Sequence, residues 1–177
     1  MITTNDVRDY FNVLGTIIIN DDVVNVTGNV HLIEQVKQLP FQFGNVTGDF
    51  KCYNNELTTL EGSPKSVGGS FWCYNNELTS LVGSPLSVKG SFRCYENKLK
   101  TLDGAPKTVE DLFHVDWQED LPMLSLLKYG KIMLIIDGND QVSRIINQHN
   151  GTKPLRKAIL DCQKDLLDAG YKGNARL

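Results

Sequence analysis

The fold is decided by the stretch FKCYNNELTTLEGSPKSV at residues 50–67. The same pattern returns as FWCYNNELTSLVGSPLSV at 71–88 and as FRCYENKLKTLDGAPKTV at 92–109, so the copies start 21 residues apart. A fixed short period is typical of a solenoid, in which each copy is one coil that buries its apolar side chains against its neighbours. The sequence therefore predicts a solenoid, which presents a laddered surface suited to binding.

Within each copy the Phe and the Cys stand two residues apart, as the inward positions of a short strand do. Two leucines and a valine per copy complete the predicted core, and a Gly-x-Pro segment turns the chain between them. An asparagine follows each Cys by three residues, where a buried amide can bond unpaired backbone groups of neighbouring coils. We therefore predict core strand positions at Phe50, Cys52, Phe71, Cys73, Phe92 and Cys94, and an asparagine ladder at Asn55, Asn76 and Asn97.

The pattern F-x-C-x-x-N-x-L resembles the L-x-L-x-x-N-x-L segment of leucine-rich repeats, with Phe and Cys in two leucine positions. The L-T-S-L of residues 78–81, followed by Pro85, is similar to the short bacterial subclass. A more particular resemblance is to leucine-rich repeat proteins of T-even-like tailed bacteriophages, which share the string C-x-x-N-x-L-x-x-L-x-G-x-P-x-x-V-x-G-x-F and a C-terminal segment similar to residues 159–177. The resemblance implies protein recognition on a concave strand face, no chemistry, and action in the cytoplasm of the bacterial host.

The pattern decays on both sides of the three copies, as capping coils should. We expect an N-terminal cap over residues 1–45, with a helix at 5–14 whose cap residue is Asn5 or Thr4, a hairpin of residues 16–20 and 23–27, and an earlier strand holding Val30 and Leu32. The solenoid is expected at residues 46–118, as a parallel sheet of about 4–5 coils. The predicted fold class is α/β.

Residues 119–177 are predicted to form a mainly helical C-terminal region. We expect a helix to Tyr129, a strand at 131–136, a helix at 140–148 capped near Asp140, and a long helix at 153–169 ended by Gly170. The last helix could cover the open end of the solenoid or form a homodimer, and both alternatives stay open. Its apolar stripe consists of Leu155, Ile159, Cys162, Leu166 and Ala169.

Each strand is expected to show two side chains to solvent. Tyr, Trp and Arg, which dominate these positions, are enriched at binding hot spots. We therefore predict a partner-binding site whose partner, by the phage resemblance, is a host defence or metabolic protein that the chain inhibits or modulates. Tyrosines that stack across strands only to stabilise the sheet are the plainer alternative. The predicted site residues are Lys51, Tyr53, Trp72, Tyr74, Arg93, Tyr95, His114 and Asp116.

Other partners are weaker alternatives. The net charge is −3, and only Lys51 and Arg93 could meet phosphates on the predicted face, so we do not expect a nucleic-acid partner. Apolar runs fall far short of the roughly 20 residues that span a bilayer, so no membrane partner is expected either. A structural or assembly role in the virion stays open as a competing class.

The sequence contains few candidate enzyme motifs, and each has a simpler structural explanation. The column of Cys52, Cys73 and Cys94 occupies apolar core positions, which favours packing over a metal site or a disulfide. Residues 135–140 resemble the strand-D-x-D start of haloacid-dehalogenase-like phosphatases, but Asn139 stands at the second Asp position, so a turn and a helix cap at Asp140 are favoured over a metal-dependent enzyme centred on Asp137. Cys162 is expected to be a core residue. We predict no enzyme activity, no metal and no cofactor.

Overall fold

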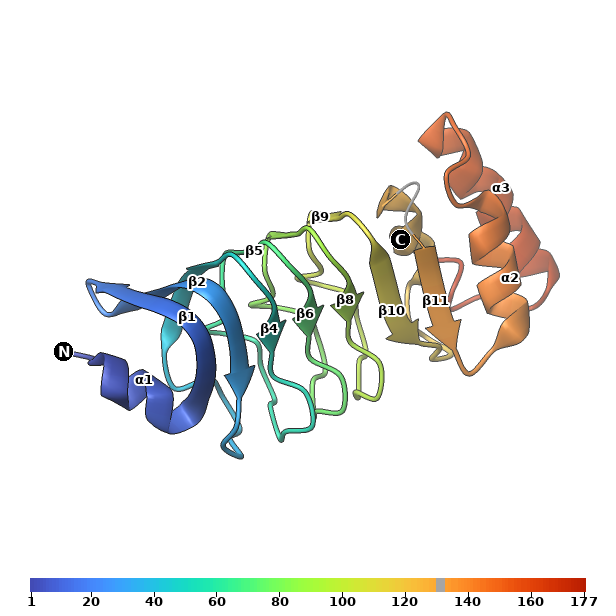
Figure 1. Ribbon diagram of the computed structural model, residues 1–177. Helices are drawn as coiled ribbons and strands as arrows, with labels where there is room; N and C mark the ends of the chain where they lie inside the picture. The colour runs from blue at the N-terminus through green and yellow to red at the C-terminus, as the bar shows by residue number, and fades with distance from the viewer. Residues whose placement is uncertain (130–132) are drawn as a thin grey trace.

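The computed structural model describes residues 1–129 and 133–177, which form a parallel β-solenoid of about five coils with helices at both ends (Figure 1). Strands β4 (Phe50–Lys51), β6 (Phe71–Trp72) and β8 (Phe92–Arg93) pair in parallel, with the three Phe residues opposite one another. Strands β10 (Leu112–Asp116) and β11 (Met133–Asp137) continue the row, so the sheet extends beyond residue 118. The predicted α/β class, parallel sheet and capped solenoid are confirmed.

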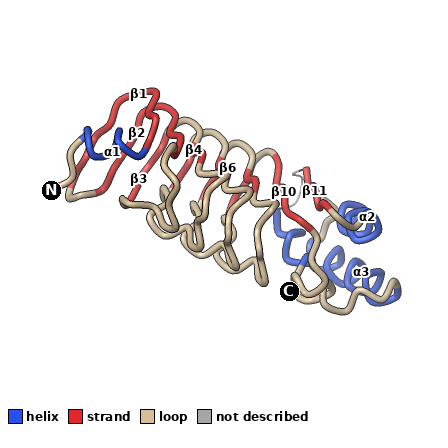
Figure 2. The backbone as a smooth tube through the Cα atoms, turned by 90° about the horizontal axis from the view of Figure 1, so that it is seen from below, coloured by secondary structure: helices blue, strands red, loops and turns tan. Residues whose placement is uncertain are grey.

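Each coil holds a second short strand that the sequence pattern did not reveal. Strands β5 (Ser66–Val67), β7 (Ser87–Val88) and β9 (Thr108–Val109) form a second parallel row that starts from β3 (Gln42–Val46). The long strand β2 (Val23–Leu32) joins the rows, because its first part pairs with β3 and its last part with β4. Figure 2 shows the coils from below, with the connecting loops stacked one behind another.

The core is a column of repeated side chains. The rings of Phe50 and Phe71 stack at 5.6 Å between centroids, and those of Phe71 and Phe92 at 5.5 Å. All six predicted Phe and Cys core positions are buried. The amide of Asn76 accepts from the N–H of Leu57 (2.9 Å) and donates to carbonyls of its own and the preceding coil, and Asn97 repeats this arrangement. The asparagine ladder is therefore confirmed.

The N-terminal cap differs from the prediction in its boundaries. Helix α1 (Thr4–Tyr10) is capped by Thr3 and not by Asn5 or Thr4, because the side chains of Thr3 and Asp6 form a reciprocal capping box. The helix ends four residues before Leu14, because Phe11 opens the ten-residue strand β1 (Phe11–Asn20), which pairs along its whole length with β2. The turn at Asp21 and Asp22 confirms the predicted hairpin, and the two strand segments expected at 23–27 and 30–32 are one strand.

The C-terminal elements follow the predicted order. They are a 3₁₀ helix, η1 (Met123–Tyr129), strand β11, helix α2 (Asp140–His149) and helix α3 (Leu155–Asp168). The cap of α2 is Asn139 and not Asp140, because the Asn139 carboxamide accepts from the N–H groups of Gln141 and Val142, both at 3.0 Å. The predicted strand start at residue 131 lies outside the described residues.

The apolar stripe of α3 is used within the chain. Cys162 and Leu166 are fully buried, whereas Leu155, expected on the same stripe, is exposed at the start of the helix. Helix α3 packs on α2 and η1, beyond the last strand of the sheet (Figure 1). A homodimer through α3 would therefore need its opposite face, where Leu160 and Leu167 are exposed.

Candidate functional site

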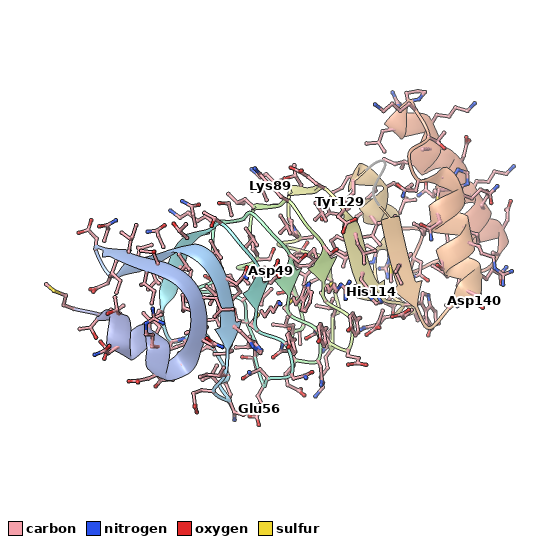
Figure 3. All side chains as sticks on the ribbon, in the orientation of Figure 1. Asp49, Glu56, Lys89, His114, Tyr129 and Asp140 are labelled. Carbon is pink, nitrogen blue, oxygen red and sulfur yellow. The ribbon has the colours of Figure 1, made fainter. Side chains whose placement is uncertain are left out.

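The structure brings all eight predicted site residues onto one surface. Lys51 lies opposite Trp72, Trp72 opposite Arg93, and Arg93 opposite His114, because the parallel strands keep the repeats in register. The tyrosines follow two residues after the first three, and Asp116 follows His114. None of the eight is buried and none is fully exposed. We call this surface the strand face; it comprises Lys51, Tyr53, Trp72, Tyr74, Arg93, Tyr95, His114 and Asp116 (His114 is labelled in Figure 3).

The tyrosines of the strand face form a stacked ladder. The rings of Tyr53 and Tyr74 lie 4.7 Å apart and those of Tyr74 and Tyr95 4.6 Å apart, within 6° of parallel. A histidine stacks on each end: His31 on Tyr53 at 5.1 Å and His114 on Tyr95 at 4.2 Å. The stack therefore has five rings. His31 is not among the residues predicted from the sequence. Its position after Val30, an expected strand residue, is the signal that could have identified it.

The stacking determines what the ladder can offer to a ligand. Both faces of the Tyr74 ring are covered by neighbouring rings, so its edge and hydroxyl are left for contact. Burial raises the pKa of Tyr74 and of Tyr95, with smaller contributions from the neighbouring tyrosines and from Glu96 respectively. The hydroxyls therefore stay protonated and can both donate and accept hydrogen bonds.

Trp72 lies between two cationic side chains. The ammonium of Lys51 stands 4.4 Å from the indole ring centroid, and the guanidinium carbon of Arg93 stands 5.2 Å from it. Lys51 also forms an ion pair with Asp49 at 3.4 Å, whereas Arg93 forms none with the residues that the structure describes. The centre of the strand face is therefore positively charged.

Two donors at this centre are unsatisfied. Trp72 Nε1 and Arg93 Nε are shielded from solvent and have no hydrogen-bond acceptor in the described part of the chain. A buried donor without an acceptor costs about 1–3 kcal/mol. The centre of the strand face thus carries donors that an incoming acceptor could satisfy.

The end of the strand face nearest β11 is acidic. Asp137, opposite Asp116 in the sheet, places its Oδ2 atom 2.5 Å from His114 Nε2, and the Asp116 carboxylate accepts from the N–H of Glu96. Burial raises the pKa of Asp116; the hydrogen bond from Glu96 opposes this, and the nearby Asp137 and Glu96 carboxylates add to it. Asp137 was weighed only as an enzyme residue in the sequence, and the structure places it beside the strand face.

The four cysteines are buried and form no disulfide. Burial raises the pKa of the Cys52, Cys73 and Cys94 thiols well above the ordinary value, and that of Cys162 to about 12. Among residues 1–129 and 133–177, no group of three or more His, Cys, Asp and Glu residues is placed to hold a metal ion. No helix in those ranges has both the length and the apolar character needed to cross a membrane.

Comparisons with known proteins add no relative. No protein-family model matches the chain, and neither a curated protein nor a solved structure matches it.

Proposed function

We propose that the chain is a non-catalytic protein-binding module that contacts its partner through the strand face. The observation that carries this proposal is the continuous ring stack from His31 to His114, with Trp72 and Arg93 beside it. Side chains already held in place by stacking lose little conformational freedom on binding, which favours affinity. Aromatic rings with polar tips, beside an arginine, are the composition of a protein-binding hot spot.

A polypeptide suits this surface better than a nucleic acid. Proteins that bind single-stranded nucleic acid stack its bases on free aromatic faces. Here both faces of Tyr74 are covered by neighbouring rings, and Trp72 lies between two cations. Only Lys51 and Arg93 among the eight residues could release counterions, and Asp116 lies on the same surface. Hydroxyl edges, an unpaired guanidinium and carboxylates instead match the mixed polar groups of a protein surface.

The resemblance to phage leucine-rich repeat proteins leads us to propose a partner from the infected bacterium. In this proposal the chain acts in the host cytoplasm and inhibits or modulates a host protein by covering its surface. Inhibition of this kind requires only occlusion. Recovery of the chain in purified virus particles would support the alternative role in virion structure or assembly.

Quantitative capture from host lysate tests the proposal. The tagged wild type is compared with a face variant, Tyr74→Ser with Arg93→Gln. The matched control is Leu86→Ser with Lys89→Gln, at two exposed positions that flank β7 in the second strand row. We expect the wild type and the control to retain one stoichiometric protein and the face variant to lose about tenfold or more in affinity. Equal capture by a face variant with an unchanged melting curve would refute the assignment of the site.

A further inference from the structure

We propose that the centre of the strand face, formed by Lys51, Trp72 and Arg93, is a receptor for a carboxylate, so that the partner presents an Asp or Glu side chain there. This inference rests on the proposed function, because it names the chemistry of the partner for the same surface. It starts from the two shielded donors, Trp72 Nε1 and Arg93 Nε, that lack acceptors among the described residues.

The three side chains at the centre can only donate hydrogen bonds. An ammonium, a guanidinium and an indole have no acceptor atom, so a group that satisfies them must be an acceptor. Lys51 and Arg93 lie beside the Trp72 ring, within 4.4 Å and 5.2 Å of its centroid. Both are long and flexible, so their charged ends can move toward an approaching anion.

The charge of the centre matches a single carboxylate. Lys51 already shares its charge with Asp49, 3.4 Å away, so Arg93 supplies the uncompensated positive charge. The planar guanidinium fork fits the two oxygens of a carboxylate. The acidic residues farther along the surface, Asp116 and Asp137, would repel a ligand that carries many negative charges. An Asp or Glu side chain of a protein partner meets these conditions.

The indole signals of the intact protein give a direct test, because the chain has two tryptophans. In two-dimensional ¹H–¹⁵N spectra, the blocked peptide acetyl-Gly-Glu-Gly-amide, which carries a single carboxylate, is titrated at constant ionic strength. We expect the Trp72 indole signal to shift and to saturate. The Trp117 signal should stay in place, because Trp117 Nε1 already donates to Asn174 Oδ1 at 3.1 Å. No movement of the Trp72 signal, or equal movement of both, would overturn the proposal.

Three variants sharpen the test. Arg93→Gln should weaken the response to this peptide at least tenfold, and the matched surface change Lys89→Gln should leave it unchanged. Asp49→Asn should strengthen the response, because it frees Lys51 from its ion pair. A stronger response to inorganic phosphate than to this peptide would overturn the carboxylate assignment.

The two proposals can fail separately. If the Trp72 signal is silent while the face variant still loses the captured protein, the carboxylate inference fails and the binding function stands. If the signal responds but capture does not depend on the strand face, the proposed function fails.

Discussion

At the scale of single residues, the third repeat departs from the other two at one backbone position. Asn54 and Asn75 have φ angles of 54° and 52°, and Glu96 holds the same left-handed conformation with φ 53°. Asparagine tolerates this region because its short side chain can bond locally, whereas a longer side chain costs roughly 1 kcal/mol. The third repeat therefore carries strain that the first two avoid.

Replacement of Glu96 by asparagine should relieve this strain. We expect Glu96→Asn to raise the free energy of unfolding by about 0.5–1 kcal/mol in urea titrations. The hydrogen bond to the Asp116 carboxylate is donated by the backbone N–H of residue 96 and should survive the change. The reverse change, Asn75→Glu, should destabilise the protein. A loss of stability in Glu96→Asn would contradict the assignment of strain.

Asp116 should make stability depend on pH. The pKa of Asp116 is raised from the usual 3.8, so the ionised carboxylate destabilises the folded state. This destabilisation is present above the raised pKa and disappears as the pH falls through that pKa. We therefore expect Asp116→Asn to stabilise the protein at pH 7, by less than about 1 kcal/mol because solvent screens a half-exposed group.

The pH series that checks this compares urea titrations of the wild type and Asp116→Asn at pH 7, 5.5 and 4. The gain should shrink as the pH falls. Asp103→Asn, a change at an exposed position in the same solenoid, serves as the control. A gain that grows on acidification would show that the Asp116 carboxylate stabilises the folded state in its ionised form.

At the scale of elements, the N-terminal hairpin depends on two facing glycines. Gly15 pairs with Gly28, and a Cβ atom at Gly15 would stand 2.0 Å from the carbonyl oxygen of Thr27. The contact is with backbone, which cannot move aside as a flexible side chain can. The close approach lies where β2 passes from pairing with β3 to pairing with β4.

A side chain at the contact between Gly15 and Gly28 should destabilise the N-terminal hairpin. We expect Gly15→Ala to cost about 2 kcal/mol or more and to speed amide exchange in β1 and β2 before the repeats are affected. Thr16→Ala, at the neighbouring exposed position, provides the comparison. Unchanged exchange in Gly15→Ala would show that the hairpin can absorb a methyl group here.

The elements also show how far the sequence could predict the structure. The Phe, Cys and Asn positions of the repeats were predictable because three copies repeat the same pattern. The ends occur once, and there pairing with β2 overrode the helical pattern, so that Phe11 became a strand residue. The second strand of each coil, as in β5, β7 and β9, could not be predicted, because a strand of two residues between turns shows no periodicity in the sequence. The eight residues of the strand face were predictable from the alternation of inward and outward side chains along each strand. The approach of Asp137 to His114 was not, because it depends on how β11 joins the sheet.

At the scale of the whole molecule, the solenoid presents one long surface between two caps. The hairpin and α1 lie at one end and α2 and α3 at the other, so the strands between them stand in an uninterrupted row (Figure 1). Each coil contacts mainly its neighbours, and the ring stack links the coils across the surface. The positive centre and the acidic end give this surface a direction, which a bound partner would have to match.

Site-specific cross-linking in host lysate tests most directly whether the strand face meets the partner. A photoreactive phenylalanine analogue is placed at Tyr74, and in separate proteins at two exposed positions: Leu86, which precedes β7 in the second strand row, and Leu160, on α3. We expect one host protein to be cross-linked from Tyr74 and from neither other position. Cross-linking of that protein from Leu86 or Leu160, with none from Tyr74, would contradict the placement of the binding site on the strand face.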